Sequence, residues 1–589
     1  MRDLWIDYTI FMVIILTSFV LTVYRNLSGR TEKTKSDYVL ADERSISLWT
    51  MLVSLAKGFL GIRVFLGYPS ELFYRGCELW ETLYGISLAF PIVAYFFVPV
   101  YLSLNITSVY EYLDMRFKSK LIRCLASAAF VIRSLLILGI TTFTPCIAIK
   151  TIIGIPFYVS ITCMTLLSML FMCSGGFTSA LMGDVVQCIL MVIICLIVIV
   201  VGIIEAGGPF NVIKISHERG RLNFLNFDLD PTKRATTISA LLGHLFISVS
   251  MYGCQQNFIQ RYISMKSKEK VIRMLILSIP FTVIMMSMPW IVGMVILTQY
   301  VDCDPKKLGY IQDIDELFPF YLEDTFLFVP GFLGIVLAVL FNGSLSAIVS
   351  NLNSVATVLW EDFVSHLHMF KNISDNKQVW SLKIISVCCS LIIMTVTFCI
   401  SELTGIIEIS IIMISATSGP LLGIFILALF FPSVNWKGAV IGMISGVLVI
   451  AWITLGAATL PKSPTVYLPT STNQCKNDTF DDSVVKHRFS VMNEESISSE
   501  AEINQMRIAN SSKSDIRHTL AEENILNSIY KVTYLYYSII GTGATVITGI
   551  IFSIVSGSHA ENYIYEEHLV HPVIHKWRPY HVPVSLEIK

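Results

Sequence analysis

The sequence is poor in charged residues. Asp, Glu, Lys and Arg make up 14% of its 589 residues, whereas a soluble globular chain carries about 25%. Hydrophobic residues make up 54%, and the mean hydropathy is +0.67. A soluble core could not hide so much apolar surface. The formal net charge of -1 provides no basic surface for nucleic acid, so we expect no nucleic-acid partner.

Several chemical signatures are also absent. The 13 cysteines form no CxxC pair and no metal-ligand spacing, and most of them lie in apolar runs as small hydrophobic residues. The sequence has no GxxxxGK[ST] phosphate loop, no HExxH motif and no nucleophile elbow. The first residues lack a signal-peptide cleavage pattern. We therefore expect neither an enzyme nor a nucleotide-driven pump.

Long apolar runs recur along the chain. A bilayer core of about 30 Å needs roughly 20 apolar residues per helix, which predicts an all-α polytopic membrane protein with the lipid bilayer as its partner. About 13 such runs lie near residues 5–25, 48–71, 80–102, 122–148, 156–174, 179–204, 237–259, 272–299, 327–359, 380–400, 404–431, 437–459 and 531–556.

The loop charges predict the orientation. Lys and Arg gather after the first run, after residue 115 and around residues 261–273, whereas the loop from Asp302 to Asp324 is acidic. Basic loops face the cytoplasm, so we expect the N-terminus outside and a cytoplasmic tail at about 557–589. Arg261 is assigned to a cytoplasmic loop by this argument.

A polar stretch at about 462–527 is predicted to be an outer loop. Asn477 and Asn510 begin glycosylation triplets within it. Cys303 and Cys475 both fall on the outer side. They could form a disulfide or remain two free thiols.

The second run carries unusual polar residues. Lys57 and Arg63 lie within it, beside Gly58, Gly61 and Pro69, which weaken a helix. Charges inside a membrane are expensive and usually mark a function or a buried pair. Snorkelling to the interface is a plausible alternative for Lys57 and a weaker one for Arg63.

Other spans also contain polar residues. Asp184 is either an interfacial acid or the partner of Lys57, and Arg133 and His244 are interpreted as members of structural pairs or as satisfied core residues rather than as ligands. The small and hydroxyl residues at 343–354 suit either close helix packing or a cation or substrate site.

Together these residues resemble the sodium:solute symporters, and within them the branch of sodium-coupled monocarboxylate, multivitamin and iodide transporters. The matching motifs are Ser36-Asp37-Tyr38-Val39-Leu40, Leu66-Gly67-Tyr68-Pro69-Ser70-Glu71, Gly175-Gly176-Phe177 with Asp184-Val185-Val186-Gln187, Tyr252-Gly253 with Gln260-Arg261-Tyr262, and Ser344-Leu345-Ser346 with Asn353-Ser354 and Glu361-Asp362.

The resemblance implies a single transporter domain over residues 1–589 with an inverted five-helix repeat. We map the two repeats to about 48–204 and 237–431. It also implies a sodium site, a small anionic or vitamin substrate, and the plasma membrane as the location. The implied sodium-site positions are Lys57, Leu60, Gly343, Ser346 and Ala347. The implied substrate positions are Arg63, Val64 and Tyr252.

The sequence departs from the family pattern at two of these positions. Ala347 stands where the family usually has a second hydroxyl, and Lys57 stands where it usually has a small residue. Two unit charges 4 Å apart repel by about 4 kcal/mol at an effective dielectric constant near 20, so the lysine ammonium could exclude sodium.

Three functional hypotheses follow from the sequence. The first is sodium-coupled symport of a small organic anion or vitamin, with a carboxylate bound by Arg63. The second is a sodium-independent uniporter or exchanger in which Lys57 replaces the ion. The third is a solute sensor that does not transport.

Overall fold

The computed structural model describes most of the chain as helices. The described residues are 5–27, 47–59, 61–104, 106–174, 177–265, 267–370, 373–402, 405–460, 467–473, 525–556 and 569–573, and they contain no strand. The α-helices are α1 (Trp5–Leu27), α3 (Leu48–Phe59), α4 (Ile62–Arg75), α5 (Thr82–Ile92), α6 (Val98–Tyr101), α7 (Glu111–Phe117), α8 (Lys120–Ile153), α9 (Phe157–Ser174), α10 (Phe177–Glu205), α11 (Pro209–Glu218), α12 (Thr237–Cys254), α13 (Gln256–Met265), α14 (Lys268–Gln299), α15 (Leu317–Phe326), α16 (Phe332–Asp362), α17 (Asp375–Ile400), α18 (Ile406–Phe430), α19 (Trp436–Thr459), α21 (Ile525–Tyr530) and α22 (Tyr537–Val555).

The membrane spans agree with the apolar runs. Within the described residues, 10 helical stretches are long and apolar enough to cross a bilayer, and α3 with α4 forms a further, bent span. Two shorter apolar helices, Trp5–Leu21 and Phe157–Cys173, fall on the remaining two runs. The predicted all-α polytopic architecture is therefore confirmed.

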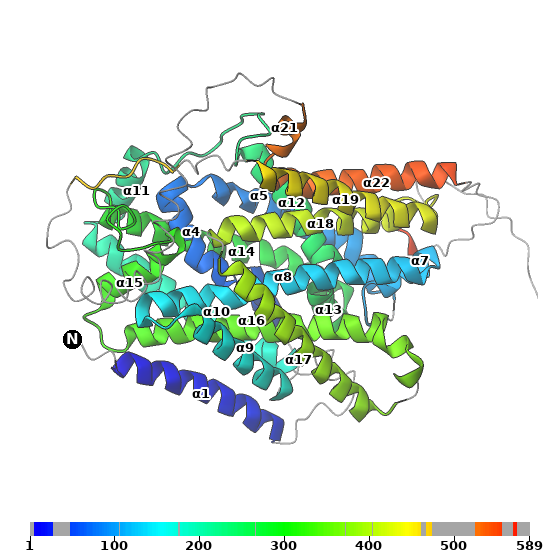
Figure 1. Cartoon of the computed structure of the whole chain (residues 1–589), viewed down its shortest axis with the longest axis horizontal. Coiled ribbons are helices and arrows are strands. Elements are labelled where there is room, and N and C mark those ends of the chain that lie inside the picture. The colour runs from blue at the N-terminus through cyan, green and yellow to red at the C-terminus, as the bar shows by residue number, and fades with distance from the viewer. Residues whose placement is uncertain are drawn as a thin grey trace, which may run out of the picture.

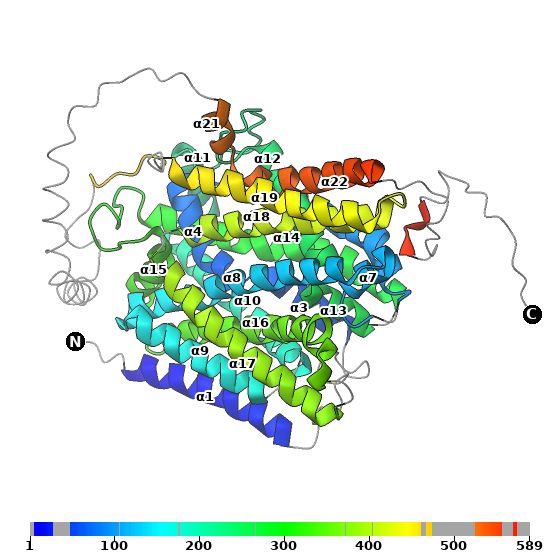
Figure 2. The ribbon, with the colours of Figure 1, turned by 45° about the vertical axis from the view of Figure 1, so that its right-hand side comes forward.

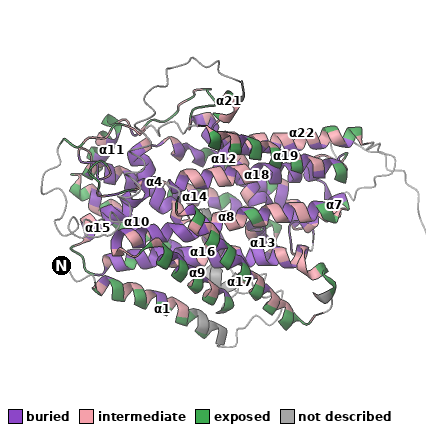
Figure 3. Ribbon diagram, viewed as in Figure 1, coloured by how far each residue is buried: buried purple, intermediate pink, exposed green. Residues whose placement is uncertain are grey.

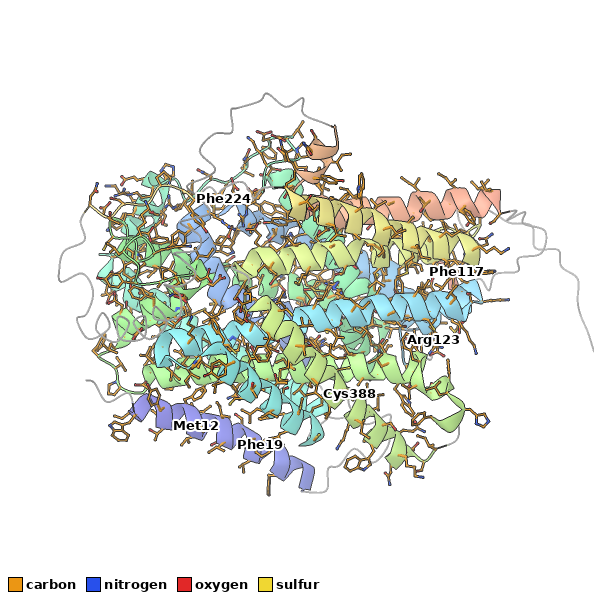
Figure 4. The ribbon with its side chains drawn as sticks, in the orientation of Figure 1. Met12, Phe19, Phe117, Arg123, Phe224 and Cys388 are labelled. Atoms are coloured by element: carbon orange, nitrogen blue, oxygen red, sulfur yellow. The ribbon has the colours of Figure 1, made fainter. Side chains whose placement is uncertain are left out.

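The helices lie roughly side by side in one bundle (Figure 1). Short helices α11 and α15 lie at one end and α7 lies at the other end, and α1 lies along an outer edge in both views (Figures 1 and 2). Helix α16 is mostly buried, whereas α1 exposes much of its surface (Figure 3). Met12, seen on α1 in Figure 4, is 52% exposed and suits a lipid-facing position.

Helix α1 is attached to α16 by a polar contact. The Asp7 carboxylate accepts a hydrogen bond from the Gly334 N–H at 2.9 Å, and Asp7 is buried. This N–H lies in the first turn of α16, where backbone donors lack partners within the helix. The contact therefore caps α16 and fixes the accessory first span against the core.

A second polar contact fixes the opposite end of α16 to α8. Arg123, labelled in Figure 4, donates to Asp362 Oδ1 at 2.7 Å through Nε. The Ser108 hydroxyl donates to Asp362 Oδ2 at 3.0 Å, and the Ser127 hydroxyl donates to the same oxygen. The buried carboxylate is thus paired and hydrogen-bonded, as a buried charge requires.

The seventh predicted run, at about 237–259, differs from a continuous helix. Helix α12 ends at Cys254 and α13 begins at Gln256, because Gln255 has extended dihedral angles of φ -105° and ψ 133°. Neither glycine nor proline stands at Gln255 itself, so the sequence pattern gave no sign of this break. Two spans of the bundle are therefore interrupted, the second one at α3/α4 and the seventh one at α12/α13.

Close helix packing depends on small residues. A Cβ added at Gly85 of α5 would lie 2.2 Å from the Leu241 carbonyl oxygen of α12. A backbone atom cannot move aside as a flexible side chain can. Gly85 therefore allows α5 and α12 to approach closely, which is how helices associate within a bilayer.

We expect the Gly85→Ala variant to be less stable than the natural protein by about 1–3 kcal/mol, because the added methyl group overlaps the α12 backbone. The apparent melting temperature in detergent measures this effect. Gly543→Ala is the matched control, since a Cβ at Gly543 meets nothing within 4 Å. The control should keep or slightly raise the melting temperature through helix propensity. Equal melting temperatures for the two variants would contradict the close-packing role.

Candidate functional site

The two interrupted helices meet at a polar cavity in the middle of the bundle. Helix α3 and helix α4 are bent by 49° relative to each other. Gly61 precedes the first residue of α4 with an extended ψ of 155°, so the chain leaves the helical path there. Gly67 and Pro69, in contrast, lie within continuous helix α4. Interrupted helices free backbone groups and terminal dipoles for a ligand.

The cavity occupies about 810 Å³, including space open to solvent, and residues of both breaks line it. A neighbouring, mainly apolar cavity of about 570 Å³ shares Gly58, Arg63, Met251 and Ile414 with it. The polar cavity is therefore adjoined by a mainly apolar one.

Lys57 lies at one wall of the polar cavity among three oxygen atoms. Its Nζ donates to Asp184 Oδ1 at 2.6 Å, to the Gly343 carbonyl at 3.3 Å and to the Ser346 hydroxyl. Lys57 and Asp184 are 3% and 2% exposed, so this is a buried ion pair and not a snorkelling lysine. The ammonium joins α3 to α10 and α16, and these helices lie together near the centre in Figure 2.

Asp184 also faces a second cation. Its Oδ2 accepts a hydrogen bond from the Ser54 hydroxyl at 2.9 Å and lies 3.7 Å from Arg261 Nη2. Arg261 donates further to the hydroxyls of Ser54 and Ser350, both at 3.3 Å. Two buried cations thus share one carboxylate, and the cluster keeps a positive charge.

Two further arginines line the same cavity. Arg63 Nη1 is buried and has no hydrogen-bond partner within the described residues. Arg133 donates to the Ser418 hydroxyl at 3.1 Å and, with the Gln255 amide in its better-satisfied orientation, to the Gln255 side-chain oxygen. Neither guanidinium pairs with a carboxylate in the part of the chain that the structure describes. The cavity is therefore cationic.

The predicted sodium-site residues are largely brought together. Lys57, Gly343 and Ser346 are in contact, and Ala347 lines the polar cavity. Leu60 lies outside the described residues. The Ser346 and Gly343 oxygens assigned to sodium by resemblance hold the Lys57 ammonium in this structure.

The predicted substrate residues are only partly brought together. Arg63 lines both cavities and Val64 lines the apolar one. Tyr252 lines neither of them: its ring packs 4.6 Å from Phe90 and 4.9 Å from Phe258, measured between centroids. Met251, the preceding residue, lines both cavities instead.

Sequence reasoning missed three cavity residues. Arg133 and His244 were interpreted as members of structural pairs or as satisfied core residues, and both line a cavity; Arg133 has hydrogen-bond acceptors, whereas His244 Nδ1 has no partner within the described residues. Arg261 was assigned to a cytoplasmic loop, whereas it is 3% exposed on α13. The sequence offered one sign of this burial: Arg261 is separated along the chain from the basic cluster at 266–273.

Two polar contacts hold the N-terminal end of α18. Arg75 at the end of α4 pairs with Glu408 of α18 at 2.9 Å. The Asp315 carboxylate, which lies in a loop outside the spans, accepts the Ile406 N–H at 2.8 Å and caps α18. Burial raises the pKa of Asp315 to about 7. The folded protein thus binds this proton more tightly than the unfolded chain, so this contribution to stability declines as the pH rises from about 4 to about 7.

The remaining site predictions concern the outer loops. Cys303 is disulfide-bonded. Cys475, its predicted partner, lies outside the described residues, so their pairing stays a prediction. Asn477 and Asn510 also lie outside them.

We expect Asp184→Asn to destabilise the protein strongly, by about 3–5 kcal/mol, because it leaves Lys57 and Arg261 as buried cations without a carboxylate. Thermal unfolding in detergent measures the loss. The matched double variant Lys57→Met with Asp184→Asn removes one of these charges and should recover part of the stability. If the Asp184→Asn variant unfolds at the same temperature as the natural protein, the ion pair does not hold α3 against α10.

Comparisons with known proteins agree with this geometry. The family model described as the sodium:solute symporter family matches residues 38–446. The human sodium-coupled monocarboxylate transporter 2 is 28% identical over 553 residues, covering 94% of this chain and 84% of that protein. A putative sodium-dependent multivitamin transporter of Drosophila melanogaster is 29% identical over 475 residues, covering 80% of this chain and 78% of that protein.

The fold also matches a solved structure. A Na+-coupled sialic acid symporter in its substrate-bound outward-open state superposes with a TM-score of 0.68 at 19% identity, covering 93% of this chain and 98% of that chain. At this identity the match concerns the fold alone. It confirms the predicted inverted-repeat architecture.

Proposed function

The chain belongs to the sodium:solute symporter family, and from this premise we propose that it carries a small organic carboxylate whose charged group binds Arg63. Family membership confirms the predicted class, which is a multi-pass membrane transporter of the sodium-coupled symport type and not an enzyme. The proposal concerns the solute and the residues that bind it.

The observation that carries the proposal is the unsatisfied Arg63 side chain. Its Nη1 lies at the junction of a polar and an apolar cavity without a hydrogen-bond partner in the described structure. A guanidinium fork fits a carboxylate by two parallel hydrogen bonds. The carboxylate end of a solute would bind Arg63, while its apolar chain would lie against residues such as Ile247 and Ile411.

Helix dipoles support an anion at this place. Helix α4 begins at Ile62, beside Arg63, and α13 begins at Gln256, between the cavity-lining residues Gln255 and Asn257. The N-terminus of a helix carries a partial positive charge. Both half-helices therefore add favourable potential for a bound carboxylate.

The repeat boundaries at about 48–204 and 237–431 fit this arrangement. Each proposed repeat has five spans and begins with an interrupted helix, α3/α4 in the first and α12/α13 in the second. The substrate would then bind where the two repeats meet, as is typical of inverted-repeat transporters.

The proposed location is the plasma membrane, with the N-terminus outside and the C-terminus in the cytoplasm. The basic residues Arg116, Lys118 and Lys120 support this orientation, since they flank the end of the bundle at α7 (Figure 1). The acidic segment Asp302–Asp324 belongs to the opposite end with α15.

We expect Arg63→Gln to raise the KM for a labelled monocarboxylate such as butyrate about 10- to 150-fold, because hydrogen bonds to a charged group contribute about 1.5–3 kcal/mol. Radiotracer uptake into proteoliposomes measures this effect. Arg63→Lys is the matched control, because it keeps the positive charge but lacks the two parallel N–H donors of a guanidinium group. Its KM should lie between those of the natural protein and of Arg63→Gln. An unchanged KM in Arg63→Gln, at equal protein content, would overturn the role of Arg63.

A second candidate concerns the ion and is favoured by the position of Lys57. The ammonium already occupies the Gly343 and Ser346 oxygens, and the nearby Arg261 adds a second positive charge. A sodium ion at this position would be repelled. In this candidate the lysine replaces sodium, and transport is uniport or exchange.

Replacing sodium by choline separates the two candidates. If Lys57 replaces the ion, uptake of the labelled carboxylate persists in choline, and Lys57→Ala makes uptake depend on sodium because the oxygen ligands are released. Lys437→Ala, an exposed lysine at the start of α19, is the matched control and should behave like the natural protein. Strict sodium dependence of the natural protein would exclude the replacement. Accumulation in either buffer would exclude a sensor that does not transport.

A further inference from the structure

The charges that line the polar cavity do not balance. Four cations, Lys57, Arg63, Arg133 and Arg261, line it with a single carboxylate, Asp184. Asp184 is engaged by Lys57 at 2.6 Å and by Arg261 at 3.7 Å. Arg63 and Arg133 are therefore left without an anionic partner among the described residues.

Such an imbalance is expensive within a membrane bundle. Arg133 is 3% exposed, and its described acceptors, Ser418 and Gln255, are neutral. Neutral acceptors satisfy hydrogen bonds but do not compensate a full charge. A buried ion that lacks a counter-charge loses several kcal/mol of hydration free energy. One bound monocarboxylate would compensate only one of the two guanidinium groups.

The placement of the two arginines suggests how both are compensated. Arg63 belongs to α4 and Arg133 to α8, and both line the same cavity. A single solute can therefore face both guanidinium groups if it carries an anionic group at each end. Ser134, the residue after Arg133, and Thr141, about two turns further along α8, add hydroxyl groups to the lining of the same cavity.

We propose that the solute of this transporter is a short-chain dicarboxylate, with one carboxylate on Arg63 and the other on Arg133. This inference rests on the proposed function, because it takes the Arg63 cavity as the transport site. It assigns to Arg133 the role of selecting a second negative charge. The four cations and Asp184 then hold a dianion with one positive charge remaining.

Succinate and butyrate provide a matched pair of probes, because both have four carbons and differ by one carboxylate. Binding of each labelled acid to the purified full-length protein is measured at pH 7.5, where both are ionised. Succinate is expected to bind on the order of tenfold more tightly than butyrate or better. Arg133→Gln should weaken succinate binding about tenfold more than butyrate binding, so that the preference is lost, and Arg133→Lys should retain part of it.

Three other outcomes of the binding experiment would contradict the inference in different ways. Butyrate binding as tight as succinate binding, or an equal loss of both in Arg133→Gln, overturns the dicarboxylate inference and leaves the Arg63 proposal standing. Butyrate binding that requires chloride, tested by replacing chloride with methanesulfonate, assigns the second charge to an inorganic anion and also overturns the inference. Absence of binding for both acids overturns the proposed function itself.

Discussion

The buried ion pair between Lys57 and Asp184 is the interaction on which the site depends. It joins α3 to α10, and through the Gly343 carbonyl and the Ser346 hydroxyl it reaches α16. Removing Asp184 would leave Lys57 and Arg261 as buried cations without a carboxylate, and removing Lys57 would leave Asp184 with Arg261 alone. Because Arg261 shares the same carboxylate, the pair does not neutralise the cavity. The positive charge that remains makes an anion the natural occupant, and it makes a second cation at this position unfavourable.

Much of the fold could be predicted because the bilayer imposes a simple rule. Each span needs about 20 apolar residues, and every apolar run lies in one or more helices of the bundle. The second span was also expected to be weak as a helix, since Gly58 and Gly61 stand together. The break at Gln255 could not be predicted, because an extended residue between two helices leaves no mark in the hydropathy. The position of this break depends on tertiary packing.

The site was predictable where one residue departs from an expected pattern. Lys57 and Arg63 stood out because a charge is rare within a span, and Asp184 followed as a partner of opposite sign. Arg133 and Arg261 were misjudged since nothing local distinguishes a cavity-lining arginine from a structural one or from one at a helix end. Only the approach of α8 and α13 to the α3/α4 break places them there. Tyr252 shows the converse error, because one residue of helix rotation moves a side chain from a cavity into the core.

Calorimetric titration of the purified protein in sodium buffer tests the central claim most directly, which is that the cations of the chain itself prepare the cavity for an anion. The account predicts that butyrate binds and that its uncharged amide, butyramide, does not, because the cationic cavity favours a carboxylate. Butyramide that binds as tightly as butyrate would contradict the account.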